Sequence, residues 1–298
     1  MIVGCSRVPT FVPGFESVQY ALCRVGLYLA VARSGLSFRP AGRSRIPDSV
    51  FQPKLSHKGY TITMTDLSAF PITKKWPAEH PDRIQLYSLP TPNGVKVSIM
   101  LEETGLPYEP HLVRFDTNDQ MSAEFVSLNP NNKIPAIIDP NGPGGKPLPL
   151  FESGAILIYL ADKSGKLMPQ DAAGRYEAIQ WVMFQMGGIG PMFGQVGFFH
   201  KFAGKEYEDK RPRDRYIAES KRLLAVLDRQ LEGRDWILGD AYSIADIATF
   251  PWVRNLIGFY EAGDLVGIDD FANVKRVLAA FVARPAVARG LEIPKRPA

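Results

Sequence analysis

The sequence predicts a protein of α/β plus all-α class, built from an α/β domain followed by an all-helical domain. Short apolar strands alternate with amphipathic helical runs over residues 84–165, whereas strand signals disappear after Gly165. From Arg175 to Pro285 the chain shows helical periodicity interrupted by Gly and Pro clusters. With 298 residues, 45% of them hydrophobic, the chain is long enough for two modest domains with a sizeable core.

The first half of the α/β domain reads as strand, helix, strand, helix. Residues 84–89 (IQLYSL) form a short buried strand, followed by the turn-forming TPNG at 91–94 and the amphipathic run VKVSIMLEETG. A second strand is expected over 109–115, and the segment MSAEFVSLNP indicates a short helix that ends before Pro130. Such a unit predicts a right-handed crossover and a parallel strand pair.

The second half of this domain reads as two strands and a helix. The segment AIIDPNGPGGKPLPLFES, from Ala136, gives two strands joined by a loop rich in Gly and Pro, which is typical of a hairpin. Its second strand, around 148–151, leads directly into the helical run GAILIYLADKSG. The complete order is β-α-β-α-β-β-α with mixed parallel and antiparallel pairing, which is a thioredoxin-like layout over 84–165.

The second domain, over 171–290, is expected to be all-helical. Residues 220–231 form its clearest amphipathic helix, with one core-facing stripe of Leu223, Leu224, Leu227 and Leu231. Ser243 and Asp246 have the spacing of a capping box, and the apolar helix that follows is expected to be kinked by Pro251. In the glycine-rich segment 186–200, Phe193, Phe198, Phe199 and His200 either line a cleft between domains or pack in the core, and the core is favoured.

Residues 1–63 differ in composition from the rest of the chain. They hold eight of the 35 Lys/Arg residues, two of the 31 Asp/Glu residues and both cysteines, Cys5 and Cys23. We expect a poorly ordered extension or a mis-annotated start there, with residues 64–83 as a short lead into the first strand. The remainder is slightly acidic, which argues against nucleic-acid binding. The apolar run 20–32 is too short to span a membrane, and a cytoplasmic location is expected.

The TPNG turn stands where a thioredoxin-like layout stabilises a reactive sulfur. A helix start offers unpaired amides and a partial positive charge, which together lower the pKa of a nearby thiol. Because this turn contains no cysteine, the thiol would come from a ligand. Thr91 and Asn93 can donate hydrogen bonds to such a sulfur, and they are the candidate catalytic residues. The alternative is that the turn serves only as a helix entry.

Two further motifs would hold the rest of the ligand. In the segment NNKIP, proline at a strand start makes Ile134–Pro135 a candidate cis peptide, and Ile134 is then able to pair with an extended peptide ligand. Glu152 and Ser153 open the last helix of the domain, where a hydroxyl and free amides suit a carboxylate and Glu152 suits an ammonium. The alternative is that both residues are ordinary helix caps.

The segments YSLPTPNGVKV, NPNNKIPA, LFESGAILIYLADK and YSIADIATFPWV together resemble the glutathione S-transferase superfamily, and specifically its Nu class, over residues 84–285. The resemblance implies Thr91 and Asn93 near the glutathione sulfur and Ile134, before Pro135, pairing with the cysteinyl backbone. It implies further glutathione-binding residues, which are Gln120, Lys133, Glu152, Ser153 and Arg215, the last from either the same or the partner subunit.

The same resemblance implies an activity. Members of this class bind two glutathione molecules or glutathione disulfide and reduce small disulfides, which predicts a glutathione-dependent disulfide-bond reductase that works as a homodimer. Glutathione would be a substrate, and no metal is expected because none of the four histidines stands at ligand spacing. The alternatives are an enzyme that conjugates glutathione to small electrophiles, with or without peroxidase activity, and a non-catalytic glutathione-binding regulator.

Overall fold

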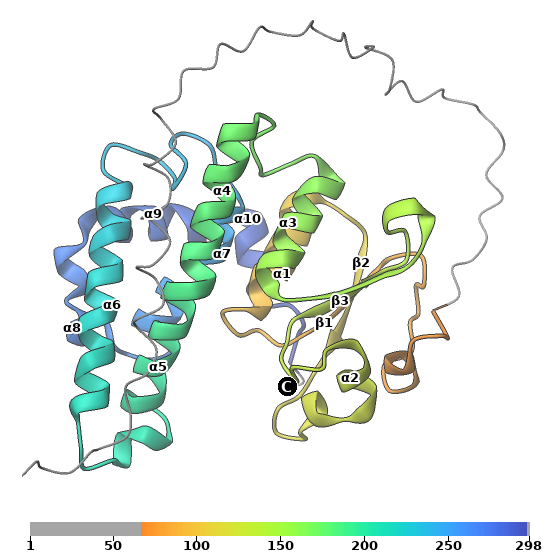
Figure 1. Cartoon of the computed structure of the whole chain (residues 1–298), viewed down its shortest axis with the longest axis horizontal. Helices are drawn as coiled ribbons and strands as arrows, with labels where there is room; N and C mark the ends of the chain where they lie inside the picture. The colour runs from red at the N-terminus through yellow and green to blue at the C-terminus, as the bar shows by residue number, and fades with distance from the viewer. Residues whose placement is uncertain (1–66, 297–298) are drawn as a thin grey trace, which may run out of the picture. The chain divides into compact units, whose positions relative to one another are not determined.

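A four-stranded sheet forms the centre of the N-terminal domain in the computed structural model, which describes residues 67–296 (Figure 1). Our expectations for residues 1–63 lie outside the described residues. The strand order is β2-β1-β3-β4, in which β1 pairs parallel with β2, and β3 pairs antiparallel with both β1 and β4. This confirms the predicted mixed pairing, and the strands are β1 Ile84–Ser88, β2 Tyr108–Leu112, β3 Ala136–Asp139 and β4 Leu148–Phe151.

The helices of this domain complete the predicted β-α-β-α-β-β-α order, and they are α1 Gly94–Thr104, α2 Ala123–Leu128 and α3 Ser153–Ser164. Single 3-10 turns precede β1, α2 and β4, at Pro71–Lys74, Asp119–Met121 and Pro143–Gly145. The strand expected to reach residue 115 ends earlier, at Leu112. Its partner β1 ends at Ser88, so the ladder stops there and the Arg114 N–H bonds instead to the Asp119 carboxylate at 2.9 Å.

Helices fill the C-terminal domain, as predicted. A long kinked rod is made of α4 Ala172–Phe184, the π-helical turn Gln185–Ile189 and α5 Gly190–His200. After the 3-10 turn Ala203–Glu206, the chain forms α6 Arg211–Gln230, α7 Ile244–Ile257, α8 Gly263–Val266, the 3-10 turn Ile268–Asp270, α9 Ala272–Val282 and α10 Pro285–Gly290. No helix among residues 67–296 is long and apolar enough to cross a membrane.

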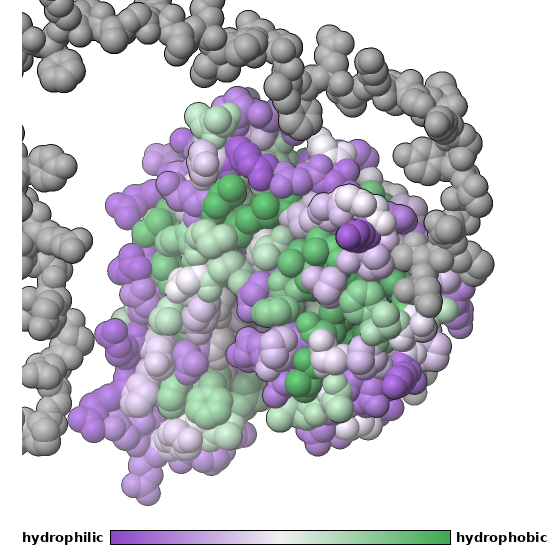
Figure 2. Space-filling model, turned by 45° about the vertical axis from the view of Figure 1, so that its right-hand side comes forward, coloured by the Kyte–Doolittle hydropathy of each residue, from purple (hydrophilic) through white to green (hydrophobic). Residues whose placement is uncertain are grey.

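The predicted core and capping residues of this domain take their expected places. The four leucines of the stripe, three on α6 and Leu231 directly after it, are all buried, because they face the other helices while the charged residues of α6 face outward. Ser243 and Asp246 form a capping box at the start of α7, and Pro251 lies within that helix, which continues through it. On the face drawn in Figure 2, apolar side chains gather toward the middle and hydrophilic ones toward the edges.

Helix α1 belongs to both domains in its contacts. The Ser98 hydroxyl donates to the Gly290 carbonyl of α10 at 2.6 Å, and a Cβ on Gly290 would lie 2.7 Å from the Ile99 backbone. Arg284, just before α10, makes a two-pronged ion pair with Glu103, with N–O distances of 2.7 and 2.9 Å. The first helix after the TPNG turn is therefore held firmly against the C-terminal domain.

The turn that starts α1 approaches the end of β1 very closely. A Cβ on Gly94 would lie 1.9 Å from the Leu89 carbonyl oxygen and 2.6 Å from the Ser88 hydroxyl oxygen. Both distances are far below van der Waals contact, and one neighbour is backbone that cannot simply move aside. Only glycine fits at this position without displacing the turn.

We therefore predict that Gly94→Ala lowers the free energy of unfolding by about 1–3 kcal/mol, because the added methyl group overpacks the turn. The measurement is denaturant unfolding followed by circular dichroism. Gly187→Ala is the matched control, since a Cβ there would meet nothing within 4 Å. Equal stability of the two variants would contradict the close approach described here.

Candidate functional site

Thr91 caps the first turn of α1, and its hydroxyl hydrogen remains free to donate. Its hydroxyl oxygen accepts a hydrogen bond from the Gly94 N–H at 3.2 Å, and its carbonyl accepts from the Val95 N–H at 3.0 Å. The hydroxyl hydrogen has no acceptor among the described residues. Thr91 therefore caps the start of the helix and also leaves an O–H that can bond to a ligand atom.

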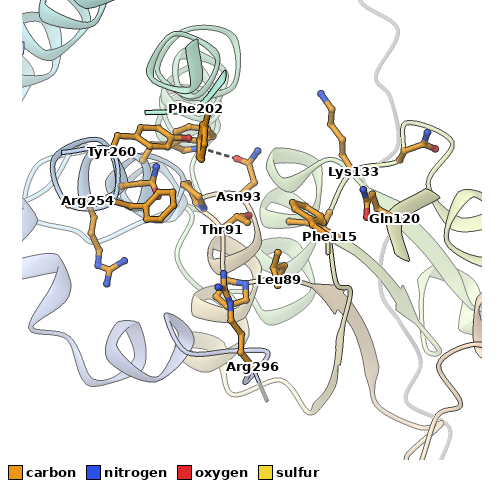
Figure 3. Close-up of a pocket in the computed structure, with 18 residues that line it drawn as sticks. Leu89, Thr91, Asn93, Phe115, Gln120, Lys133, Phe202, Arg254, Tyr260 and Arg296 are labelled. Carbon is orange, nitrogen blue, oxygen red and sulfur yellow. Dashed lines mark hydrogen bonds between the residues drawn. The ribbon is translucent and has the colours of Figure 1, made fainter. Parts of the chain in front are cut away.

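Asn93 is oriented by a tryptophan of the other domain. The indole Nε1 of Trp252, on α7, donates to Asn93 Oδ1 at 2.9 Å, which is the dashed line in Figure 3. An indole N–H is a donor only, so its partner must be the amide oxygen of Asn93 and not the amide nitrogen. The Asn93 Nδ2 group is thereby left to donate elsewhere, because no described residue accepts from it.

A cleft of about 930 Å³ opens at this turn between the two domains (Figure 3). Five of the predicted site residues line it together: Thr91, Asn93, Gln120, Lys133 and Ile134. The C-terminal domain contributes the facing wall, with Phe202, Trp252, Arg254, Asn255, Gly258, Phe259 and Tyr260. The cleft lies near the upper end of the range of small-molecule sites, roughly 300–1,000 Å³.

The loop before β3 presents an unpaired stretch of backbone to this cleft. The Ile134–Pro135 peptide bond is cis, as predicted. Neither the N–H nor the carbonyl of Ile134 bonds to any described residue, so both are available to an extended ligand. Asn129 holds this loop in place, because its side chain accepts from the Asn131 N–H at 2.9 Å and donates to the Lys133 carbonyl at 2.5 Å.

Glu152 and Ser153 stand at the start of α3, opposite this loop in the β3–β4 ladder, since Ala136 pairs with Phe151. Glu152 has φ 70° and ψ 111°, a conformation that is costly for a residue with a side chain and is often found at ligand sites. Ser153 is buried, and its hydroxyl oxygen accepts from the Lys96 ammonium at 3.2 Å. Neither residue is part of the cleft lining.

Gln120 and Arg215 have contrasting positions. Gln120 lines the cleft, and its Oε1 atom is buried without a hydrogen-bond partner, so it is able to accept a hydrogen bond from a ligand. Arg215 lies exposed on α6 and is not part of the cleft lining of its own chain. The chain thus brings Gln120 to the other predicted residues but does not bring Arg215 to them.

The aromatic residues of the cleft are not those singled out in the sequence. Phe193 is buried in the core, as favoured, and none of Phe193, Phe198, Phe199 and His200 lines the cleft. Phe202 takes that role with Phe259 and Tyr260, at ring-centroid distances of 6.1 and 5.9 Å. The signal for Trp252 was present but weak: a buried indole N–H needs an acceptor, and α7 itself offers none.

Comparison with known proteins decides the family. Residues 83–162 match the model of the glutathione S-transferase N-terminal domain, and residues 212–280 match that of the C-terminal domain. The chain is 42% identical over 220 residues to the disulfide-bond oxidoreductase YghU of Escherichia coli, covering 71% of this chain and 74% of that protein. The chain belongs to the glutathione S-transferase family.

Solved structures of glutathione transferases share the fold. One from Burkholderia graminis, with two glutathione molecules bound per subunit, is 86% identical and covers 80% of this chain and 99% of its own, with a TM-score of 0.79. One from Pseudomonas putida, with one glutathione disulfide bound per subunit, is 74% identical and covers 77% and 99%, with a TM-score of 0.76. In the present glutathione S-transferase, residues 67–296 contain no group of three or more His, Cys, Asp or Glu side chains arranged to hold a metal ion.

Proposed function

We propose that this glutathione S-transferase is a glutathione-dependent disulfide-bond reductase in which the start of α1 holds the sulfur of bound glutathione as a thiolate. The observation that carries the proposal is the pair of reserved donors at the TPNG turn, the Thr91 hydroxyl and the Asn93 amide. Both stand at a helix N-terminus, where the partial positive charge favours an anion. The sequence from Met64 onward holds no cysteine, so the reacting thiol belongs to the ligand.

The rest of the tripeptide extends along the residues that the sequence singled out. Its cysteinyl backbone pairs with the free N–H and carbonyl of Ile134, as an added strand would. Its γ-glutamyl end, which carries an ammonium and a carboxylate, binds at Glu152 and Ser153. Gln120 and Lys133 assist from the same wall of the cleft.

Disulfide reduction then needs two glutathione molecules and no other reductant. The bound thiolate attacks one sulfur of the disulfide substrate, forms a mixed disulfide and expels the other half as a thiolate. A second glutathione thiolate attacks the glutathionyl sulfur of the mixed disulfide, which releases glutathione disulfide and the second substrate thiol. The two protons lost by the two glutathione thiols end on the two product thiols. The size of the cleft supports this order of reaction steps, as do the two glutathione molecules bound per subunit in the Burkholderia graminis relative.

A second candidate function is conjugation of glutathione to an apolar electrophile. The rings of Phe115, Phe202 and Phe259 at the cleft favour it, because they offer apolar surface facing the turn. The two functions separate in one comparison of substrates: turnover of hydroxyethyl disulfide against turnover of an aromatic halide, each with glutathione. Faster conjugation than reduction would favour the second function over the first.

We further propose that the chain acts in the cytoplasm, as a Nu-class homodimer. Helix α4 exposes Tyr176 by 72% and Met183 by 50%, seven residues apart and so on one face, and a second copy of the chain covers that face. Arg215, remote from its own cleft, would then contact glutathione in the partner. Light scattering that finds a monomer would contradict this assembly.

For Arg215 we predict that Arg215→Ala weakens glutathione binding by roughly tenfold, through loss of one charge-assisted hydrogen bond. Binding is measured by calorimetry on the dimer. Arg211→Ala is the matched control, because that side chain is 90% exposed and pairs only with Asp209. An unchanged affinity in Arg215→Ala would remove this residue from the site.

The experiment that tests the proposed function removes both donors. We predict that the double variant Thr91→Ala, Asn93→Ala lowers kcat/KM for hydroxyethyl disulfide roughly 100-fold, because two hydrogen bonds to a developing charge are lost. Thr73→Ala is a control that deletes a hydroxyl bonded only to the Leu67 and Phe70 carbonyls. Full turnover by the folded double variant would refute the proposal.

The orientation of Asn93 makes a separate prediction. Trp252→Phe keeps an aromatic ring but removes the indole donor, so the amide of Asn93 is no longer held with Nδ2 toward the ligand. We expect kcat/KM to fall roughly tenfold and the acidic limb of its pH profile to move to higher pH, because the glutathione thiolate is less stabilised. Trp76→Phe is matched, since it deletes an indole donor bonded to the Leu112 carbonyl away from the cleft. Equal effects of the two substitutions would contradict an orienting role.

A further inference from the structure

Lys96 is a fully buried lysine in the first turn of α1, two residues after the TPNG turn. Lysine is almost never fully buried unless its charge is paired, because removing an ammonium from water is costly. Its Nζ atom contacts the Ser153 hydroxyl oxygen at 3.2 Å, Gln185 Oε1 at 2.5 Å and Met186 Sδ at 3.6 Å. All three partners are neutral, and no carboxylate of the described residues lies within salt-bridge distance.

The electrostatic surroundings of Lys96 leave its charge poorly balanced. Burial lowers the pKa of Lys96 to about 7, and the Glu152 carboxylate acts against that by raising it. From the π-helical turn the facing groups are Gln185 and Met186, both neutral. The charged groups on the other helices packed against α1 lie or pair elsewhere. On α3, Asp162 pairs with Arg175 and Lys163 pairs with Asp139. On α7, Asp246 bonds to Ser243 and the Ile237 N–H, and Arg254 lines the cleft; on α10, Arg289 pairs with Glu102.

The bond to Ser153 gives this charge a route to the ligand. An ammonium has no lone pair, so Ser153 Oγ must be the acceptor, and the serine keeps its own hydroxyl hydrogen for another partner. That hydrogen is directed at the Met186 sulfur, 3.5 Å from the oxygen, which is a weak acceptor. A carboxylate at the start of α3 is a far stronger acceptor, and it would meet the helix amides and the Lys96 charge together.

We propose that Lys96 is a positioning residue for the anionic end of the ligand: its buried ammonium orients the Ser153 hydroxyl and supplies the counter-charge that a carboxylate meets at the start of α3. The inference rests on the proposed function, in which the γ-glutamyl end of glutathione binds at Glu152 and Ser153. Gln185 and Met186, at the start of the π-helical turn, hold the ammonium from the other domain. Lys96 therefore also makes the anionic end of the site sensitive to how the two domains meet.

The proposal has a thermodynamic consequence that a purely structural lysine would lack. With a pKa of about 7, Lys96 is mostly neutral in the free protein above that pH. A carboxylate bound nearby favours the charged form and so raises the pKa, which means that the ligand binds together with a proton. Affinity is then full below about pH 7, and it falls as the pH rises above that value until Lys96 of the complex also loses its proton.

The test uses S-methylglutathione, whose blocked sulfur removes any contribution from the thiol. Binding is measured by titration calorimetry on the full chain at about pH 7.5 to 8.5, in buffers with different ionisation heats, so that proton uptake is read directly. We expect the parent protein to take up a fraction of one proton for each ligand molecule that binds. Lys96→Met should abolish that uptake and weaken binding roughly tenfold at about pH 7.

Two further variants complete the design. Lys166→Met is the matched control, because Lys166 bonds the Thr104 carbonyl at the other end of α1 and should leave both uptake and affinity unchanged. Gln185→Glu keeps the lysine but places a carboxylate against it, which holds it charged. This variant should therefore also lose proton uptake and bind the ligand more weakly, and it decides the matter if Lys96→Met does not fold.

The outcomes separate the inference from the proposed function. Failure of S-methylglutathione to bind at any pH would overturn the proposed function itself. Two results would overturn only the role of Lys96. One is binding to the parent protein without proton uptake. The other is proton uptake that persists in Lys96→Met or, if that variant does not fold, in Gln185→Glu. Uptake that disappears in these variants and remains in Lys166→Met supports the proposal.

Discussion

The close approach of α1 to the end of β1 is the constraint on which the rest of the site depends. Gly94 permits it, since a side chain there would overlap the Leu89 carbonyl. Because the turn packs so close to the end of β1, the Thr91 hydroxyl can cap the helix while its hydrogen stays available. The same packing brings Asn93 within hydrogen-bond distance of Trp252. A change of turn geometry by one side chain would therefore disturb both donors at once.

The same helix also makes the site a property of both domains. Along α1, Asn93 contacts α7, Lys96 contacts the π-helical turn, Ser98 contacts α10 and Glu103 contacts Arg284. The Asn93 amide, one of the two donors that we assign to the glutathione sulfur, is thus oriented by Trp252, 159 positions away in the sequence. In the proposed site the N-terminal domain provides the two donors to the sulfur, and the C-terminal domain orients one of them, Asn93.

Much of the fold was predictable because its signals are local. The strand and helix order, the Leu223–Leu231 stripe and the capping box of Ser243 each depend on residues close in sequence, and all appear as expected. Thr91, Asn93 and Ile134 followed from a turn and a loop with recognisable chemistry, and Gln120 and Lys133 followed from the family resemblance. Trp252, Lys96 and Phe202 did not, because each gains its role from a neighbour brought close only by folding. A lysine in an amphipathic helix normally indicates the solvent face, and only the meeting of two domains buries Lys96.

Stabilisation of a bound thiol as its anion is the property that we propose for the start of α1. Its most direct test is the pKa of the glutathione thiol in the complex, followed by the ultraviolet absorbance of the thiolate as the pH is varied with the protein saturated. We predict a thiol pKa below that of free glutathione by one unit or more, which corresponds to roughly 1.4 kcal/mol per unit. A pKa equal to or above the value in free solution would contradict it.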